Sequence, residues 1–335
     1  MNTELLPFSE QSAKKAAEIM AAGGGVGIPT ETVYGLAADA RNEAAVRSIF
    51  EAKGRPQDNP LIVHISAREQ LPPLVREIPE LALKIAEKYW PGPLTMIFPK
   101  SDMIPAATSG GLDTVAVRMP ESPAARAIID ACGFPLAAPS ANLSGSPSPT
   151  YCTIIDCMAV GYAIDPTLVE TRKCRCGVES TVLCFPAADR VRILRPGGVT
   201  AEMLSELCQA DIDPAVTSEP PKGAKVMSPG MKYKHYSPKA EVFIVNAHGK
   251  QFGDWCMSHA AEGTLALSAD PVEHGMFRCF GRDTAEQAHR LFALLREADD
   301  EGAKTIYVEM PSKEGIGLAV YNRLLRAAAF RVIEV

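Results

Sequence analysis

KGRPQDNPLIVHIS, residues 53–66, joins the end of a helix to a strand through a short turn. The residues that lead into it, EAAVRSIFEAKG (43–54), carry apolar side chains at helical spacing, so a helix is predicted to end near Lys53. Pro56 and Pro60 disfavour helix in the turn, because proline fixes φ and restricts the residue before it. LIVHIS is strongly apolar and predicts a buried strand. This succession indicates a domain that combines helices with a sheet.

The rest of the N-terminal part repeats the mixture. Helices are predicted from about Ser9 and over PELALKIAEKYW (79–90). Further short strands are predicted at VGIP (26–29), LTMIF (94–98), TVAVRM (114–119), PLAAPS (135–140), VESTVL (178–183) and VRILRP (191–196). Several of these strands end in polar residues followed by Pro, Ser or Gly, which places side chains at the rim of a sheet. We predict an α/β or α+β domain with a mixed, twisted sheet.

The C-terminal part alternates strands with helices. EVFIV, TLALS and TIYVEM are predicted strands, while DTAEQAHRLFALLREADDEG (283–302) and GIGLAVYNRLLRAAA (315–329) are predicted helices. Asp283 is the expected N-cap of the first helix and Gly302 its stop. This alternation predicts a small parallel, doubly wound sheet, and it contains no glycine fingerprint for a dinucleotide. Five prolines in the stretch from Asp211 to Pro238, with Pro238 included, indicate a linker. The predicted limits are 1–208 for the first domain, 209–238 for the linker and 239–335 for the second domain.

Composition narrows the class of protein. The chain has 335 residues, a formal net charge of −6 and nine cysteines. Scattered cysteines in odd number indicate reduced thiols, and KCRCG (173–177) is not a recognised zinc pattern, so no metal site is predicted. We find no stretch typical of a membrane span or a signal peptide, and we therefore expect a cytoplasmic protein. The acidic charge argues against a general nucleic-acid coat, although a local basic cleft remains open.

The turn that follows the helix at 43–54 is a candidate anion site. Lys53 and Arg55 could neutralise a polyphosphate, with the guanidinium binding two oxygens and the ammonium acting as a point charge. The alternative is that both cations only complement the helix C-terminus. Asn59 would add an amide at the same turn, and His64 lies in the strand as either a ligand or a structural group.

Strand periodicity adds a second group. In TVAVRM, Thr114, Ala116 and Arg118 share one face, and the residues between them form an apolar face. That pattern fits a polar cavity above a core, or a half-solvated strand.

A third group consists of hydroxyls and amides. APSANLSGSPSPT (138–150) is either a simple turn or a loop that offers hydroxyls and backbone N–H groups to phosphate. GVESTV and RILRPGG add Ser180 and Arg195. Cations, hydroxyls and amides suit the binding and positioning of anions more than a covalent intermediate.

Six motifs carry a resemblance when they are taken in order. PTETVYGLAADA, KGRPQDNPLIVHI, AVRMP, APSANLSG, GVESTV and ILRPGG together resemble the YrdC-like domain of L-threonylcarbamoyladenylate synthases. SPGMKYKHYSP (228–238) and the terminal helix resemble the linker and appended domain of the two-domain form. The resemblance implies a YrdC-like mixed twisted sheet with a concave cavity, plus a small Rossmann-like parallel α/β C-terminal domain.

The resemblance also implies a reaction. The family makes L-threonylcarbamoyl-AMP from L-threonine, bicarbonate and ATP with release of pyrophosphate, and Mg²⁺ is expected with the ATP. A tRNA threonylcarbamoyltransferase complex is the expected recipient, for modification of tRNA next to the anticodon. Two alternatives remain: a non-catalytic module that binds double-stranded RNA on the same concave surface, and a carbamoyltransferase of the hydrogenase-maturation type. The second is disfavoured because its zinc-finger-like and acylphosphatase segments are not found in this sequence.

Residues are assigned through the same motifs. The Lys-x-Arg and Ser-x-Asn signature falls on Lys53, Arg55, Ser140 and Asn142, of which the two cations are the expected catalytic pair. The expected ATP contacts are Arg55, Asn59, Thr114, Ser140, Asn142, Ser148, Arg195, Tyr233 and His235. The expected threonine contacts are Thr32, His64, Arg118, the backbone of Ala138, and Ser180. No residue is assigned as the general base.

Two segments depart from this simple assignment. The Pro-bounded linker is expected to act as a lid, with Lys232, Tyr233, Lys234 and His235 facing the nucleotide, unless it is only a solvated connector. VETRKCRCGVEST stands where the family usually has an Asp-Gly-Gly-like turn, so the loop is expected to differ in shape and charge.

Overall fold

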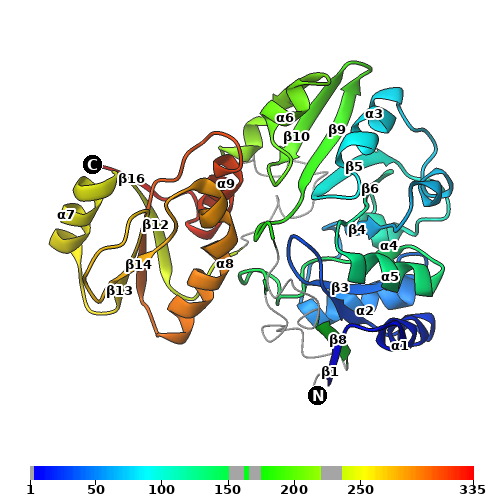
Figure 1. Cartoon of the computed structure of the whole chain (residues 1–335), viewed down its shortest axis with the longest axis horizontal. Coiled ribbons are helices and arrows are strands. Elements are labelled where there is room, and N and C mark those ends of the chain that lie inside the picture. The colour runs from blue at the N-terminus through cyan, green and yellow to red at the C-terminus, as the bar shows by residue number, and fades with distance from the viewer. Residues whose placement is uncertain (1–3, 151–161, 166–174, 220–235) are drawn as a thin grey trace.

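The chain forms two sheets that lie side by side (Figure 1). The computed structural model describes residues 4–150, 162–165, 175–219 and 236–335. In this described part, eleven strands form one sheet and five form the other. No helix in the described ranges is long and apolar enough to cross a bilayer.

The larger sheet is mixed, as predicted. Its strands, in order across the sheet, are β1 (Glu4–Pro7), β8 (Tyr162–Asp165), β2 (Val26–Ile28), β3 (Gly35–Asp39), β7 (Leu136–Ala137), β4 (Ile62–His64), β6 (Thr114–Arg118), β5 (Leu94–Pro99), β9 (Thr181–Ala187), β10 (Arg190–Arg195) and β11 (Gln209–Ile212). β4 pairs in parallel with β6 and antiparallel with β7, while β6 pairs antiparallel with β5. His64 and Arg118 are partners in the β4–β6 register, so the ends of these two strands bring both side chains to one edge.

Helices cover the larger sheet, and four of those described begin at a side-chain cap. The helices are α1 (Glu10–Ala21), α2 (Glu43–Lys53), α3 (Glu80–Tyr89), α4 (Ala106–Ser109), α5 (Pro123–Cys132) and α6 (Ala201–Ser205), with short 3₁₀ turns at Arg68–Gln70, Pro72–Leu74 and Pro214–Val216. The four that begin at a side-chain cap are α1, α2, α5 and α6. Ser9 and Ser12 form a capping box at the start of α1, which confirms the helix predicted from about Ser9. Asn42 caps α2, and Gly54, at φ 59°, ends it directly after Lys53, as predicted.

The two faces of β6 are only partly as predicted. Val115, Val117 and Met119 are buried in the main core with residues of α2 and α3, which confirms the apolar face. On the opposite face, Ala116 belongs to a smaller apolar cluster, and only Arg118 reaches the pocket described below. That face is therefore apolar in its middle and polar at one end.

The smaller sheet is entirely parallel, as predicted. Its order is β14 (Phe277–Cys279), β13 (Thr264–Ser268), β15 (Thr305–Glu309), β12 (Glu241–Asn246) and β16 (Val332–Glu334). α7 (Gly249–His259) packs in one apolar cluster with the sheet, while α8 (Thr284–Asp300) and α9 (Gly317–Ala327) pack in another. Asp283 caps α8 as expected, with its side chain accepting from the Glu286 N–H. Figure 1 shows α8 and α9 between the two sheets, so these helices can contact both.

The start of the linker needs a correction. Residues 209–212, which we assigned to the linker, form β11 and extend the larger sheet by pairing in parallel with β10. In QADI only Ile212 favours a strand, and the conformation of this segment depends on the neighbouring strand rather than on its own composition. The domain limits 1–208, 209–238 and 239–335 otherwise stay predictions.

Candidate active site

A pocket lies at the edge where β4 and β6 end. The lining residues are Thr30, Thr32, Val33, Gly35, Lys53, Arg55, Pro60, Leu61, Ile62, His64, Arg118, Ala138, Pro139, Ser140, Asn142, Ser144, Glu179, Ser180, Arg195 and Tyr236. The predicted residues that the fold brings together here are Thr32, Lys53, Arg55, His64, Arg118, Ala138, Ser140, Asn142, Ser180 and Arg195.

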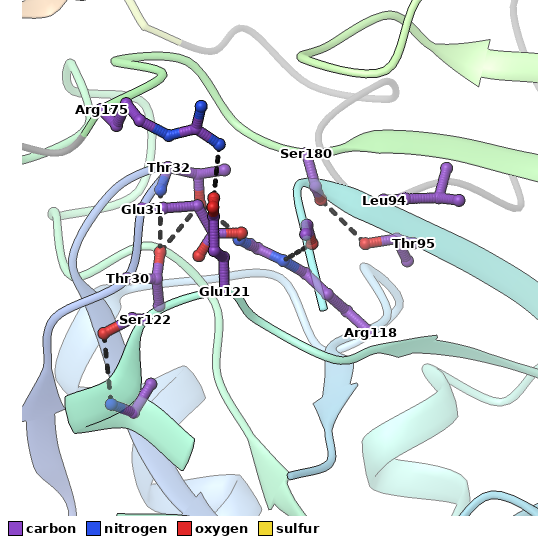
Figure 2. Close-up of polar contacts among 12 residues, drawn as sticks. Thr30, Glu31, Thr32, Leu94, Thr95, Arg118, Glu121, Ser122, Arg175 and Ser180 are labelled. Carbon is purple, nitrogen blue, oxygen red and sulfur yellow. Dashed lines mark hydrogen bonds and ion pairs between the residues drawn. The ribbon is translucent and has the colours of Figure 1, made fainter. Parts of the chain in front are cut away.

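Arg118 is held in a defined orientation at one side of the pocket. Its Nη1 donates to Thr32 Oγ1 at 2.8 Å and its Nε donates to the Gly92 carbonyl at 3.3 Å. Its Nη2 lies 2.5 Å from Glu31 Oε1, and both side chains of this ion pair are almost fully buried. Figure 2 shows the guanidinium directed at Thr32 and Glu31. A guanidinium fixed in this way is suited to bind a carboxylate in one geometry.

His64 lies next to Arg118 and is neutral. Burial, helped by repulsion from Arg118, lowers the pKa of His64 to about 3. Its Nδ1 is 3.1 Å from the Ile62 carbonyl oxygen, which can only accept, so Nδ1 carries the proton. His64 therefore contributes a hydrogen-bonding group to the pocket and no charge at neutral pH.

Ser180 and Arg195 also line the pocket, and Ser180 lies near Arg118 because it contacts Thr95, the register partner of Arg118. The Ser180 hydroxyl lies 2.8 Å from Thr95 Oγ1, and Arg195 donates from Nε to the Ser180 carbonyl at 3.0 Å and from Nη2 to its hydroxyl at 3.1 Å. Figure 2 shows Ser180 and Thr95 facing each other. Burial lowers the pKa of Arg195 to about 10, which still leaves the side chain charged at neutral pH.

Lys53 connects the α2 turn to the loop after β7. Its side chain is 2% exposed, and its Nζ donates to the carbonyl oxygens of Ser140 and Asn142. The ammonium thereby fixes both loops that carry the Lys-x-Arg and Ser-x-Asn signature. This contact rules out a purely solvated role for Lys53 at the helix end.

Arg55 and Asn59 belong to the same turn. Arg55 donates from Nε to the Asn59 carbonyl at 3.2 Å and from Nη2 to the Pro60 carbonyl at 3.0 Å. Asn59 is buried, and no described group pairs with its Nδ2. Asn142 is similar, because it donates from Nδ2 to two carbonyls while its buried Oδ1 has no partner among the described residues.

Three predicted ATP contacts do not line the pocket: Asn59, Thr114 and Ser148. Thr114 is at the start of β6, and a strand rises about 3.3 Å per residue, so Thr114 lies about 13 Å along the strand from Arg118. Ser148 is fully buried, and its hydroxyl donates to Glu179 Oε1 at 2.6 Å. The other predicted contacts, Tyr233 and His235, and the predicted lid residues Lys232 and Lys234, lie outside the described residues.

Sequence reasoning overlooked several residues of this site. Glu179 and Tyr236 line the pocket, Glu31 orients Arg118, and Thr95 contacts Ser180. Glu31 and Glu179 are each the direct neighbour of a predicted threonine contact inside a quoted motif, which was a usable signal. Thr95 carried no such signal, because the pairing of β5 with β6 and β9 places it there.

The described residues contain no group of three or more His, Cys, Asp or Glu side chains that could hold a metal ion. Within the pocket wall, Glu179 is the carboxylate, and both of its oxygens bind other side chains. These side chains do not form a ligand set of their own for Mg²⁺, which prefers carboxylate, phosphate and water oxygens.

Comparison with known proteins shows the family of this chain. A family profile described as "Telomere recombination" matches residues 18–197, and one described as "Threonylcarbamoyl-AMP synthase, C-terminal domain" matches residues 199–329. Proteins named threonylcarbamoyl-AMP synthase from Pyrococcus abyssi and Bacillus subtilis are 41% and 38% identical to this chain. The alignments cover 98% and 99% of this chain and 97% of each relative.

Solved structures agree over the full length. The crystal structure of P. abyssi Sua5 complexed with L-threonine has a TM-score of 0.90 and 40% identity, covering 99% of this chain and all of that one. The E. coli YciO structure, at 18% identity and a TM-score of 0.53, covers 61% of this chain and shows the fold of that part alone. The chain therefore belongs to the threonylcarbamoyl-AMP synthase family.

Proposed function

We propose that the pocket binds L-threonine, bicarbonate and ATP and joins them into L-threonylcarbamoyl-AMP, with release of pyrophosphate. The proposal rests above all on the charge of the pocket wall. Four cations, Lys53, Arg55, Arg118 and Arg195, line the pocket, and Glu179, a carboxylate of the wall, is already paired with Arg323. A wall of this kind favours ligands that carry several negative charges, such as a triphosphate and a carboxylate.

The amino acid is placed at the Arg118 side. Arg118 is oriented by Glu31, Thr32 and the Gly92 carbonyl, and it retains N–H groups that these contacts do not use. His64, Ala138 and Ser180 complete a small polar recess around it. The relative from P. abyssi was crystallised with L-threonine, which supports an amino-acid subsite in this fold.

The nucleotide is placed at the Lys53 side. Arg55 and Lys53 supply charge there, and Asn142, which also lines the pocket, holds a buried amide oxygen without a partner among the described residues. A buried polar group that stays unpaired costs about 1–3 kcal/mol, so a ligand that satisfies this atom gains binding energy. Asn142 Oδ1 would accept from an N–H or O–H group of the ligand.

The reaction then requires alignment more than a covalent intermediate. The amine of threonine and bicarbonate condense to a carbamate with loss of water. A carbamate oxygen attacks the α-phosphorus of ATP, the P–O bond to the β-phosphate breaks, and pyrophosphate leaves in line. Fixed cations stabilise the charge that develops, and a buried wall limits hydrolysis of the mixed anhydride.

Mg²⁺, the expected companion of ATP, would be held mainly by the phosphate oxygens. Mg²⁺ commonly keeps several waters and binds through substrate phosphates, so it does not require a protein cage. Since the pocket wall offers no ligand set of its own, no step is assigned to the metal.

Three further expectations remain part of the proposal. The product would pass to a tRNA threonylcarbamoyltransferase complex, weak RNA binding would accompany that transfer, and the protein would act in the cytoplasm. The comparisons do not favour the alternative of a non-catalytic module for double-stranded RNA, because the full-length relatives are named as synthases.

An omission experiment tests the proposal. Purified protein is incubated with ATP, Mg²⁺, bicarbonate and threonine, and pyrophosphate is measured when each component is left out in turn. We expect release only when all substrates are present. Release that is independent of threonine would reject the proposal. Tight binding of double-stranded RNA without any pyrophosphate release, in a filter assay across salt concentrations, would favour the alternative.

A further inference from the structure

The segment 177–180, whose Glu179 and Ser180 line the pocket, packs against the helices of the smaller sheet. Ser180 of this segment faces the pocket and contacts Thr95 and Arg195. Val178, two residues earlier, is fully buried, and it belongs to the core cluster of β12, β13, β15, α8 and α9 rather than to the core of the larger sheet. Val33, another residue of the pocket wall, belongs to that same cluster. The C-terminal core thus extends to the pocket.

Gly177 shows how closely α8 approaches this segment. A Cβ at this position would lie 2.4 Å from the carbonyl oxygen of Ala288 and 2.4 Å from the Cα of His289, both in the backbone of α8. The glycine also has φ +70°, a conformation that L side chains rarely adopt. The start of the segment is therefore pressed directly against the α8 backbone, with no room for a side chain.

Arg323 of α9 fixes the middle of the segment. Its side chain is fully buried, its Nε donates to Glu179 Oε2 at 2.9 Å and its Nη2 to the Glu179 carbonyl at 3.3 Å. The third nitrogen, Nη1, donates to Asn322 Oδ1 at 2.9 Å. All three nitrogens of the guanidinium are therefore committed, and two of them hold the backbone and side chain of Glu179.

Glu179 is held from the other side as well. Its second carboxylate oxygen accepts from Ser148 at 2.6 Å. Burial alone would raise the pKa of Glu179, but attraction by Arg323 and Arg195, together with the hydrogen bonds from Ser148 and Arg323, lowers it below its ordinary value. Glu179 is thus an ionised group clamped between α9 and the 138–150 loop, directly before Ser180.

We propose that α8 and α9 position the segment 177–180, which carries the pocket residues Glu179 and Ser180, and that Arg323 is the positioning residue through which α9 sets the orientation of these two residues. This inference rests on the proposed function, since Ser180 is a proposed threonine contact. It assigns the C-terminal domain a part in substrate binding that does not depend on the linker. Arg323 does not line the pocket, so it acts through Glu179 and not on the substrate.

The test compares variants of one helix in the full-length chain. Arg323→Lys keeps a buried positive charge but loses the forked geometry, and Arg323→Met removes the charge. Arg326→Met is the matched control, because Arg326 lies on the same helix, donates to the Ala215 carbonyl and does not line the pocket. The measurements are kcat, the KM for threonine, the KM for ATP and the melting temperature of each protein.

We expect Arg323→Lys to lower kcat/KM for threonine by about tenfold or more, since small misplacements of binding groups have effects of this size. The KM for threonine should rise more than the KM for ATP, and Arg326→Met should leave both near the wild-type values. A purely structural role predicts a lower melting temperature with unchanged constants at 25 °C, and that result would overturn the proposal. If Arg323→Met does not fold, the kinetic constants of Arg323→Lys alone decide between the positioning role and a purely structural role.

A double-mutant cycle checks the route of the effect. If Arg323 acts through Glu179, then Glu179→Gln combined with Arg323→Met should have little more effect on kcat/KM than either change alone. Additive losses would overturn the assignment of Glu179 as the intermediary. A wild-type chain that forms no product would reject the proposed function itself, whereas product formation with unaffected variants would reject only the positioning role.

Discussion

Arg118 Nη2 lies 2.5 Å from Glu31 Oε1, and the two side chains are 4% and 6% exposed. A buried ion pair is often neutral for stability as a whole, but the loss of one partner leaves the other charge uncompensated. The pair therefore fixes the guanidinium in place without a large net contribution to folding. Arg118 thus has two roles that mutagenesis can distinguish: it compensates the buried charge of Glu31, and it is proposed to bind the carboxylate of threonine.

Arg118→Leu should reduce the free energy of unfolding by about 3–5 kcal/mol, because the Glu31 carboxylate would stay buried without its counter-charge. Urea unfolding at neutral pH measures this loss. The double variant Arg118→Leu with Glu31→Gln should recover part of the stability, since it leaves no uncompensated charge at the position of this ion pair. Threonine binding should stay lost in both proteins. Recovery of threonine affinity in the double variant would contradict the role of Arg118 in binding the carboxylate.

Lys53→Met should raise the KM for ATP about 10- to 100-fold, since hydrogen bonds to charged groups contribute about 1.5–3 kcal/mol each. Methionine retains most of the buried stem but cannot donate to the carbonyls of Ser140 and Asn142. Steady-state kinetics with varied ATP provide the measurement. Lys84→Met is the control, because Lys84 is exposed and pairs with the exposed Glu80 on the surface of α3. An equal effect of both substitutions would argue against a specific role for Lys53.

Thr95→Val should raise the KM for threonine by about 3- to 10-fold, which corresponds to one neutral hydrogen bond. The substitution preserves shape but removes the hydroxyl that lies 2.8 Å from the Ser180 hydroxyl. Thr108→Val removes a comparable buried hydroxyl, which donates to the Ala40 carbonyl away from the pocket. We expect similar losses of stability from both changes and a kinetic effect from Thr95→Val alone. A raised KM in Thr108→Val would show that the effect is general.

His64 makes the protein sensitive to acid. Its pKa is lowered to about 3 in the folded chain, against 6.5 for an ordinary histidine, so the unfolded chain binds the proton more readily. Stability from this group is complete above pH 6.5 and is lost as the pH falls toward 3, by about 1.4 kcal/mol per unit. Urea unfolding at several pH values should therefore give a flatter profile for His64→Gln than for the wild type. Parallel profiles would contradict the burial of a neutral histidine.

Local signals predicted the regular elements well where caps and periodicity agree. Asp283 caps α8, Ser9 caps α1, and the apolar face of β6 lies in the main core. Strands whose sequences have a weak strand signal were not predicted. β3 reads GLAAD and β11 reads QADI, and each is a strand because of its partners in the sheet rather than its own residues.

The sequence predicted most of the residues of the site, but it did not predict how they are arranged in space. The predicted pocket residues are spread over the sequence from Thr32 to Arg195. They come together because the parallel strands β4 and β6 end at the same edge and because Lys53 connects two loops. The Glu179–Arg323 pair joins residues 144 positions apart, and no periodic pattern reports a contact of that range. Thr114 is an error of the other kind, a residue that periodicity predicted at the site and that is not there. It shares a strand face with Arg118 but does not line the pocket.

The central claim is that this pocket joins threonine, through a carboxyl group from bicarbonate, to the AMP part of ATP. Mass spectrometry of the reaction with [¹³C]bicarbonate tests it most directly. The account predicts a threonine–AMP adduct that contains one added carboxyl carbon and carries the ¹³C label, and it predicts that Arg118→Leu abolishes this adduct. An unlabelled adduct, or undiminished formation of the labelled adduct by the Arg118→Leu protein, would contradict it.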